Sequence, residues 1–227
     1  MGTRTNDDRK TSDYREDKRL ENIINTIMEE NFYTKGEWNY YRYIEDEEIQ
    51  DRGIDLILGL GGTKRKIDEK AQVKYATNPL QTFALELMNT SSKKIGWFLD
   101  DYKETEYYMF LWPKAEKKRF KKDDVISIDY ALVKRKKLKE LVYTGLGIDE
   151  SKLLYYVDLL RKREIGIEHN GLVRYKDHPF NKGMYLVYTL DNNLAEAPIN
   201  LVIRKKDIEW ISYKKGTIQN QIGVKNG

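Results

Sequence analysis

The sequence contains no cysteine among its 227 residues, so neither disulfide bridges nor thiolate metal sites are available to it. Its two histidines, His169 and His178, lie in a polar, turn-rich stretch without the spacing of metal ligands, and we assign them no metal. No apolar run is long enough to span a bilayer, and the start lacks the apolar segment of a signal peptide. These absences exclude a disulfide-stabilised domain and a membrane-spanning helix, and we expect a cytoplasmic protein without a membrane partner.

A large excess of charge of one sign is also missing. Charged residues make up 34% of the chain, but 41 Lys and Arg against 37 Asp and Glu leave a formal net charge of only +4. Charge summed over the whole chain therefore says little about partners, whereas local clusters of charge say more. Hydrophobic residues make up 40% of the chain, which is enough for a packed core. The length fits one sizeable domain, or one core with an appended subdomain.

The spacing of apolar residues predicts an α/β protein. Apolar side chains recur every three to four positions over residues 17–31, which is typical of an amphipathic helix. Further helices are expected at 79–88, with Pro79 in the first turn, and at 138–146, 151–163 and 205–211. Strands are expected at 38–44, 54–58, 66–73, 95–99, 107–112, 185–190 and 199–203. This order predicts a mixed central sheet flanked by helices, with an α+β C-terminal extension.

The character of the chain changes after Pro113, where a strongly basic stretch begins. We therefore expect a core over residues 1–113 and a basic C-terminal region over residues 114–227, long enough to hold a recognition subdomain. Residues 1–16 and 215–227 are polar and mixed in charge, and both segments are expected to be flexible.

The most informative segment consists of two neighbouring predicted strands that carry charges among apolar residues. Asp55 lies between Ile54 and Leu56, and Asp68 and Lys70 are two residues apart, so on a strand they point to the same face. Two carboxylates and an ammonium on one face are costly to bury unless they hold a metal ion and a reacting water. The alternative is that Asp68 and Lys70 form an exposed ion pair on an edge strand.

Asp55 followed by Asp68-Glu69-Lys70 resembles the motif of the PD-(D/E)xK nuclease superfamily, which has the restriction-endonuclease-like fold. In that superfamily a first Asp lies on one strand and a D/E-x-K tripeptide on the next, within a core ordered helix, three strands, helix, strand. The resemblance covers about residues 17–112. It departs from the full pattern at Ile54, which stands where a proline often precedes the first Asp.

The resemblance implies a divalent cation, Mg²⁺ or Mn²⁺, bound by Asp55 and Asp68 with the main-chain carbonyl of Glu69 as a third ligand. Such a cation neutralises charge and lowers the pKa of a bound water. Lys70 would orient or deprotonate that water, or stabilise the developing charge. Gln72, the next residue on the same face, would position water or phosphate.

Many members of the superfamily add a carboxylate from the first helix to the metal site. Glu21, at the border of the apolar face of the first predicted helix, is the candidate here, and Asp17, one turn earlier, is an alternative. A carboxylate beside an apolar helix stripe is, however, commonly just solvated.

Two runs of basic residues follow the predicted core and could contact phosphates of a nucleic acid. They comprise Lys117, Lys118, Arg119, Lys121 and Lys122, and then Lys134, Arg135, Lys136 and Lys137. Dense positive charge of this kind gives salt-sensitive affinity that does not depend on sequence. A solvated helix face is the alternative interpretation.

Together these features predict a metal-dependent DNA endonuclease that hydrolyses phosphodiester bonds, similar to a restriction enzyme or to a nuclease of a phage or mobile element. We expect double-stranded DNA as the partner. Cutting both strands needs two active sites, which a homodimer would supply. The alternatives are a catalytically inactive nucleic-acid-binding module of the same fold, and a protein-interaction domain.

Overall fold

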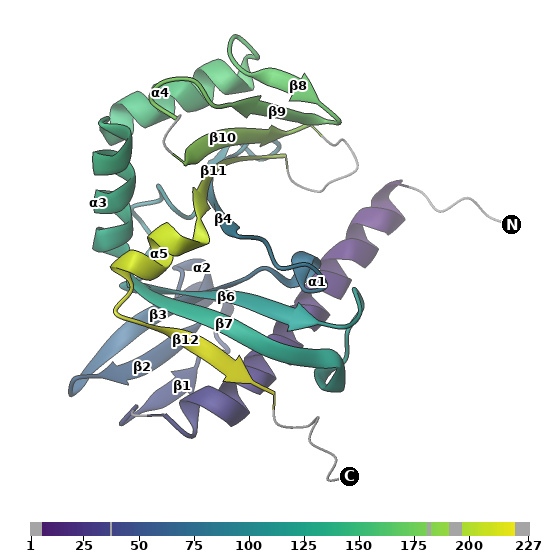
Figure 1. The fold of residues 1–227 in the computed structure, drawn as a ribbon, viewed down its shortest axis with the longest axis vertical. Coiled ribbons are helices and arrows are strands. Elements are labelled where there is room, and N and C mark those ends of the chain that lie inside the picture. Colours follow the sequence, from purple (N-terminus) through teal and green to yellow (C-terminus); the bar gives the residue numbers. More distant parts are fainter. Residues whose placement is uncertain (1–5, 37, 181–182, 191–196, 221–227) are drawn as a thin grey trace, which may run out of the picture. The chain divides into compact units, whose positions relative to one another are not determined.

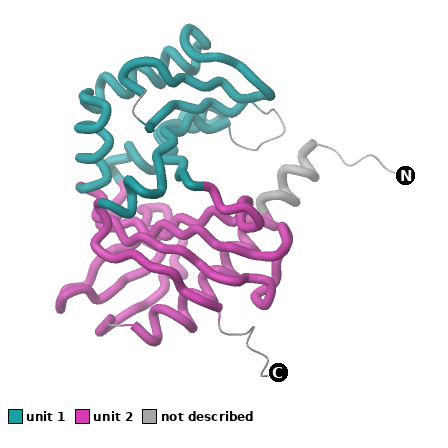
Figure 2. The backbone as a smooth tube through the Cα atoms, in the orientation of Figure 1, with its two compact units in different colours: residues 1–10, 81–102, 137–210 teal, residues 11–80, 103–136, 211–227 magenta. Residues whose placement is uncertain are grey.

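The protein is a mixed α/β structure with two six-stranded sheets and helices (Figure 1). The computed structural model describes residues 6–36, 38–180, 183–190 and 197–220, with side chains from residue 15 onward. The chain divides into two compact units (Figure 2). Unit 1 comprises residues 1–10, 81–102 and 137–210, and unit 2 comprises residues 11–80, 103–136 and 211–227.

Unit 2 contains the first sheet, with strand order β1-β2-β3-β6-β7-β12. Its strands are β1 (Tyr41–Tyr43), β2 (Leu56–Leu60), β3 (Thr63–Ala71), β6 (Tyr107–Ala115), β7 (Val125–Lys134) and β12 (Lys214–Gln219). Its helical segments are α1 (Asn6–Met28, which begins in unit 1), η1 (Glu29–Tyr33), α2 (Glu47–Asp51), η2 (Val73–Tyr75) and η3 (Lys122–Asp124). Neighbouring strands are antiparallel except β3 and β6, which are parallel. The sheet is therefore mixed, as expected.

Helix α1 covers one face of this sheet. Leu20, Ile24 and Ile27 are spaced three to four residues apart and are buried against Leu58 of β2 and Met109 of β6. The three-to-four-residue spacing in α1 and the two-residue spacing in the strands therefore both direct apolar side chains into this interface. The predicted helix at residues 17–31 is confirmed in kind, but α1 starts earlier, at Asn6, and includes part of the segment expected to be flexible.

A tight turn joins β2 to β3. Gly61 and Gly62 both have positive φ, 54° and 78°, which non-glycine residues rarely adopt. Two such residues between antiparallel strands form the kind of turn that matches the twist of a hairpin. The turn fixes the register of β2 against β3, with Leu56 opposite Ile67.

Unit 1 contains the second sheet, which is antiparallel throughout, with strand order β5-β4-β11-β10-β9-β8. Its strands are β4 (Thr82–Asn89), β5 (Lys94–Ile95), β8 (Ile167–His169), β9 (Leu172–Tyr175), β10 (Met184–Thr189) and β11 (Pro198–Arg204). Its helices are α3 (Arg135–Leu146, which begins in unit 2), α4 (Glu150–Arg161) and α5 (Lys205–Ile211). The helices predicted at 138–146, 151–163 and 205–211 are thus confirmed apart from their ends.

The helix predicted at residues 79–88 is wrong, because this segment forms β4. Phe83, Leu85 and Leu87 are buried alternately, with the period of a strand, and β4 pairs with β11. The same residues also fit a short helical stripe, and pairing with a strand more than a hundred residues away decided between the two.

The strand predicted at residues 95–99 is shorter than expected, since β5 ends at Ile95. Gly96 lies against the main chain of β4, where an added Cβ would come within 2.3 Å of the Glu86 carbonyl oxygen. The chain turns away after this close approach.

The two compact units do not follow the division expected at Pro113. Pro113 lies within β6, and each unit contains segments from both sides of it. Among the described residues, no helix is both long and apolar enough to cross a membrane.

Candidate active site

The structure brings Asp55 and Asp68 close together in unit 2. The pairing of β2 with β3 ends at Leu56 and Ile67, directly beside Asp55 and Asp68, and the Asp55 carboxyl lies close enough to act on the Asp68 carboxyl. Asp55 itself precedes β2 by one residue, and its main-chain N–H donates to the Ile67 carbonyl oxygen at 2.9 Å. Its side-chain Oδ2 accepts a hydrogen bond from the Glu69 N–H at 2.8 Å. The Asp55 carboxylate is thus fixed against the backbone of β3.

Lys70 forms an ion pair with Asp68 on the same face of β3. Their Nζ and Oδ1 atoms are 2.5 Å apart, and the two side chains are 26% and 3% exposed, respectively. Strand β3 lies inside the sheet between β2 and β6, where Asp68 is opposite Tyr108 and Lys70 is opposite Phe110. The alternative of an exposed pair on an edge strand is therefore wrong.

Burial raises the pKa of Asp68 to about 7. The Lys70 ammonium opposes this rise, and the neighbouring Asp55 carboxyl adds to it. For Lys70, burial lowers the pKa, but the carboxylates of Asp68 and Asp55 outweigh burial and raise the pKa overall. Lys70 therefore carries its positive charge at neutral pH, which suits a group that orients water or stabilises negative charge better than one that removes a proton.

The side chain of Glu69 points to the opposite face of β3, toward α1 and η1. Its Oε1 accepts a hydrogen bond from the Tyr33 hydroxyl at 2.6 Å. Burial raises the pKa of Glu69 to about 7, although the hydrogen bond from Tyr33 lowers it. The Glu69 side chain is therefore not part of the Asp68 face, and the expectation for this residue concerns only its main-chain carbonyl.

Glu21 of α1 lies within electrostatic range of this cluster. Burial raises its pKa, the Lys70 ammonium lowers it, and the Asp55 carboxylate raises it. Asp17, the alternative carboxylate, instead forms an ion pair with Lys74, with 2.8 Å between its Oδ2 and Nζ. Glu21 thus interacts electrostatically with Lys70 and Asp55, and its role as a metal ligand stays a prediction.

Gln72 lies one residue beyond β3 and precedes η2. Its main-chain N–H donates to the Leu111 carbonyl oxygen of β6 at 3.0 Å, so the pairing of the two parallel strands extends to this residue. Gln72 is half-buried. Its role at the site stays a prediction.

Within the described ranges, no three His, Cys, Asp or Glu side chains are grouped closely enough to hold a metal ion by themselves. Asp55 and Asp68 are the predicted ligands that the structure brings together, and the Asp55 carboxyl contributes to the raised pKa of Asp68.

The two predicted basic runs lie at opposite ends of β7 instead of forming one surface. Residues 117–122 precede β7, and residues 134–137 lie at its far end and in the start of α3. A ten-residue antiparallel strand is about 30 Å long. A single short stretch of phosphate backbone therefore does not meet both runs at once.

Members of these runs differ in what they already contact. Lys117 is paired with Asp124 at 2.5 Å, and Lys122 forms an ion pair with Glu30. Arg135 is half-buried and donates to the Lys103 carbonyl oxygen at 2.6 Å. Lys137 is paired with Glu140 at 2.9 Å and belongs to unit 1. The exposed members are Lys117, Lys118, Arg119, Lys121, Lys134, Lys136 and Lys137.

Sequence reasoning missed further cations on the same face of β3. Lys64 and Lys66 precede Asp68 and Lys70 at intervals of two, so all four share one strand face. This alternation of charged residues was visible in the sequence. The sequence alone did not reveal that β1 and β2 contribute further residues to the same face of the sheet.

Comparison of the chain with protein-family models, curated proteins and solved structures found no match.

Proposed function

We propose that unit 2 is the core of a metal-dependent DNA endonuclease with a restriction-endonuclease-like fold. The observation that carries the proposal is the association of the Asp55 and Asp68 carboxyls, with Lys70 paired to Asp68 two residues further along β3. Their residue types and chain order are those that the resemblance to the PD-(D/E)xK superfamily implies for hydrolysis of a phosphodiester.

The order of elements in unit 2 supports the same proposal. Helix α1 comes first, β1, β2 and β3 follow as an antiparallel series, and β6 joins β3 as a fourth strand. This resembles the helix-first, mixed-sheet core expected from the sequence. It differs where β4 stands in place of the expected second helix.

The carboxylates fit a hard divalent cation such as Mg²⁺ or Mn²⁺. Asp55 and Asp68 supply oxygen ligands, which such cations prefer. Two neighbouring carboxylates repel each other, and this repulsion contributes to the raised pKa of Asp68, so a bound cation would stabilise both in the charged form. The cation would supply charge neutralisation and a more acidic water, with the Glu69 carbonyl and Glu21 as further candidate ligands.

Lys70 would act on the phosphate side of the reaction. Its ammonium is held at Asp68, is charged, and remains partly exposed to solvent. A charged donor there can orient the attacking water and stabilise the negative charge that develops on the phosphate oxygens.

The test is cleavage of plasmid and linear duplex DNA by the purified full chain, with and without Mg²⁺. Asp55→Asn, Asp68→Asn and Lys70→Met are each expected to lower the cleavage rate at least about a hundredfold. Matched controls are Asp123→Asn and Lys215→Met, which alter exposed residues of the same unit and should leave the rate unchanged.

Full activity of Asp68→Asn would overturn the assignment. Binding of DNA without Mg²⁺-dependent cleavage would favour an inactive nucleic-acid-binding module of this fold. Failure to bind DNA at moderate salt would favour a protein-interaction domain.

A further inference from the structure

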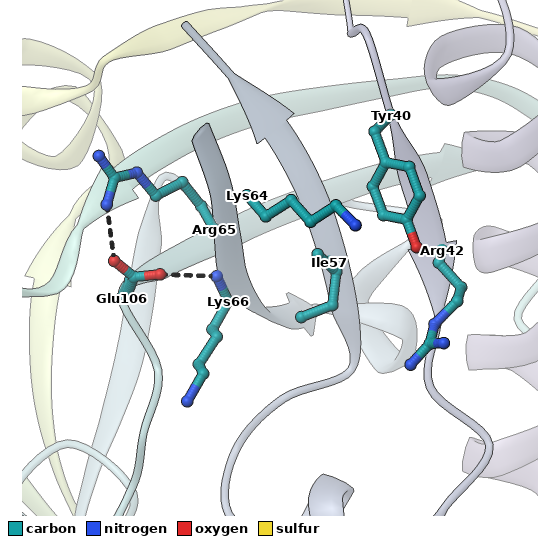
Figure 3. Close-up of a pocket in the computed structure, with 7 residues that line it drawn as sticks. All are labelled: Tyr40, Arg42, Ile57, Lys64, Arg65, Lys66 and Glu106. Atoms are coloured by element: carbon teal, nitrogen blue, oxygen red, sulfur yellow. Dashed lines mark hydrogen bonds and ion pairs between the residues drawn. The ribbon is translucent and has the colours of Figure 1, made fainter. Parts of the chain in front are cut away.

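A basic pocket of about 280 Å³ lies on unit 2, over strands β1, β2 and β3 (Figure 3). It is lined by Tyr40, Arg42, Ile57, Lys64, Arg65, Lys66 and Glu106. Four cationic residues and a single acidic residue thus line the pocket. Positive charge concentrated in a concave site raises the local concentration of anions, so the pocket is built to attract a negatively charged group.

The pocket and the candidate active site share one face of the same strands. Arg42, Ile57 and Lys66 lie directly across from one another on β1, β2 and β3. Asp68 is two residues further along β3 than Lys66, and Asp55 directly precedes β2. Because side chains two apart on a strand share a face and are about 7 Å apart, the pocket adjoins the carboxylates.

Two of the four cations form the wall of the pocket through contacts with protein carboxylates. Arg65 donates to Glu106 at 3.0 Å, and the Lys66 main-chain N–H donates to the other oxygen of the same carboxylate at 3.0 Å (Figure 3). The Lys66 ammonium forms an ion pair with Glu104. These contacts hold β3 and the segment before β6 together at the edge of the pocket.

The other two cations remain available to a ligand. Lys64 lies over the ring of Tyr40, with its Nζ 4.2 Å from the ring centroid, and this cation–π contact holds the ammonium over the pocket. Arg42 is exposed on β1. Within the part of the chain that the structure describes, neither Arg42 nor Lys64 forms an ion pair with a carboxylate.

We propose that this pocket binds a backbone phosphate of the polynucleotide, held by Arg42 and Lys64, beside the bond that is hydrolysed at Asp55 and Asp68. The proposal rests on the proposed function for the identity of the anion. The separation of about 7 Å along β3 places the bound phosphate close to the carboxylates. A volume slightly below the roughly 300–1,000 Å³ of small-molecule sites suits a phosphate with part of its sugar better than a base pair.

The pocket also explains how a DNA strand could be held in a fixed position for cleavage. The guanidinium of Arg42 can contact two phosphate oxygens at once, whereas Lys64 acts as a point charge. Fixing one phosphate at a set distance from the carboxylates would align a neighbouring phosphodiester with them. Arg42 and Lys64 are thus positioning residues in this proposal, because they contact the substrate away from the reacting atoms.

The test measures binding of a short fluorescent DNA duplex by anisotropy over a series of salt concentrations, in EDTA so that no cleavage occurs. The Arg42→Gln/Lys64→Gln double variant of the full chain is expected to bind at least about threefold more weakly than the wild type. Its slope of log affinity against log salt should be smaller by about 1. The control is Lys206→Gln/Lys215→Gln, which removes the same charge from two exposed lysines elsewhere. With Lys in place of Gln at position 42 of the double variant (Arg42→Lys/Lys64→Gln), part of the affinity should return. Thermal melting checks that each variant is folded.

Two duplexes, with 5′-hydroxyl and with 5′-phosphate ends, separate an internal phosphate from a terminal one. Equal wild-type affinity for both supports an internal phosphate in the pocket. A preference for the 5′-phosphate duplex that is lost in the double variant supports a terminal one.

The pocket proposal is overturned if the double variant matches the control in affinity and salt slope, or if the wild type does not bind the duplex. If the variant effect is present but the wild type never cleaves DNA with Mg²⁺, the pocket stands and the proposed function fails.

Discussion

The six-stranded sheets of unit 1 and unit 2 both bury apolar side chains, but the buried charges associated with them are arranged differently. In unit 2, Asp68 is 2% exposed and lies near a second carboxylate, Asp55, with Lys70 beside it. In unit 1, the buried Lys205 starts helix α5 and lies 3.7 Å from Glu209, one turn later on the same helix.

The buried charge of unit 1 has a structural explanation, whereas the arrangement of charges in unit 2 is not explained by stability. Opposite charges four residues apart on a helix are a common stabilising pair. Two neighbouring carboxylates repel each other, and burying one of them, Asp68, inside a sheet costs free energy. Proteins retain such arrangements where the charges act on a ligand or a reaction.

The largest expected effect is a pH dependence of stability that comes from unit 2. The pKa of Asp68 is raised from 3.8 to about 7 in the folded state. Between these values the folded protein keeps a proton that the unfolded chain releases. In the absence of divalent cations, the free energy of unfolding should therefore fall as the pH rises from about 4 to about 7, by up to about 4 kcal/mol from this group.

Urea unfolding in EDTA at several pH values measures this fall. Asp68→Asn should remove most of it, and Glu69→Gln should remove a separate share, because burial also raises the pKa of Glu69 to about 7. If the free energy of unfolding of Asp68→Asn falls by the same amount over this pH range, the Asp68 carboxyl is not the source of the pH dependence.

Lys70→Met should destabilise unit 2 by about 3 kcal/mol near pH 8, because it leaves the buried Asp68 carboxylate without its counter-charge. Near pH 5 the loss should be smaller, since Asp68 is then mostly protonated in the folded state. Urea unfolding at the two pH values measures the difference. Equal losses at both would mean that Lys70 contributes through packing alone.

Lys205→Met provides the counterpart in unit 1. Its partner Glu209 is 32% exposed and stays solvated when the lysine is removed. The free energy of unfolding should change by no more than about 1 kcal/mol. The change should also be the same at about pH 5 and about pH 8. A loss of stability as large as that of Lys70→Met would show that the buried lysines of the two units contribute to stability in the same way.

The smallest expected effect on stability concerns the basic run before β7. Lys118→Glu/Lys121→Glu alters two exposed residues and should change stability by less than about 0.5 kcal/mol. If this run contacts phosphates, the salt slope of DNA binding should fall by about 1 to 2. Lys206→Glu/Lys215→Glu serves as the control of equal charge. An identical slope in both double variants would assign the run to a solvated surface.

The sequence determined the local elements whose periodicity was strong. The helix around Leu20, Ile24 and Ile27 and the strand beginning at Tyr107 were both predicted from their spacing. The charges of Asp68 and Lys70 on one strand face also followed from their separation by two residues, because side chains alternate along a strand. These features depend only on neighbours in the chain.

Tertiary structure decided what depends on distant segments. The pattern of residues 82–89 fits both a helix and a strand, and pairing of β4 with β11 selects the strand. The proximity of Asp55 to Asp68 depends on the pairing of β2 with β3 across the turn at Gly61 and Gly62, and the burial of Asp68 depends on β6 joining β3.

The basic pocket likewise could not be predicted from the sequence, because its lining includes residues of three strands and Glu106. Lys64 and Lys66 could be assigned to the face of Asp68 from their spacing alone. That Arg42 lies across from Lys66, with Ile57 between them, is a consequence of strand order. A one-residue shift in either pairing would turn Arg42 or Asp55 to the opposite face, so register, which the sequence does not reveal residue by residue, decides both sites.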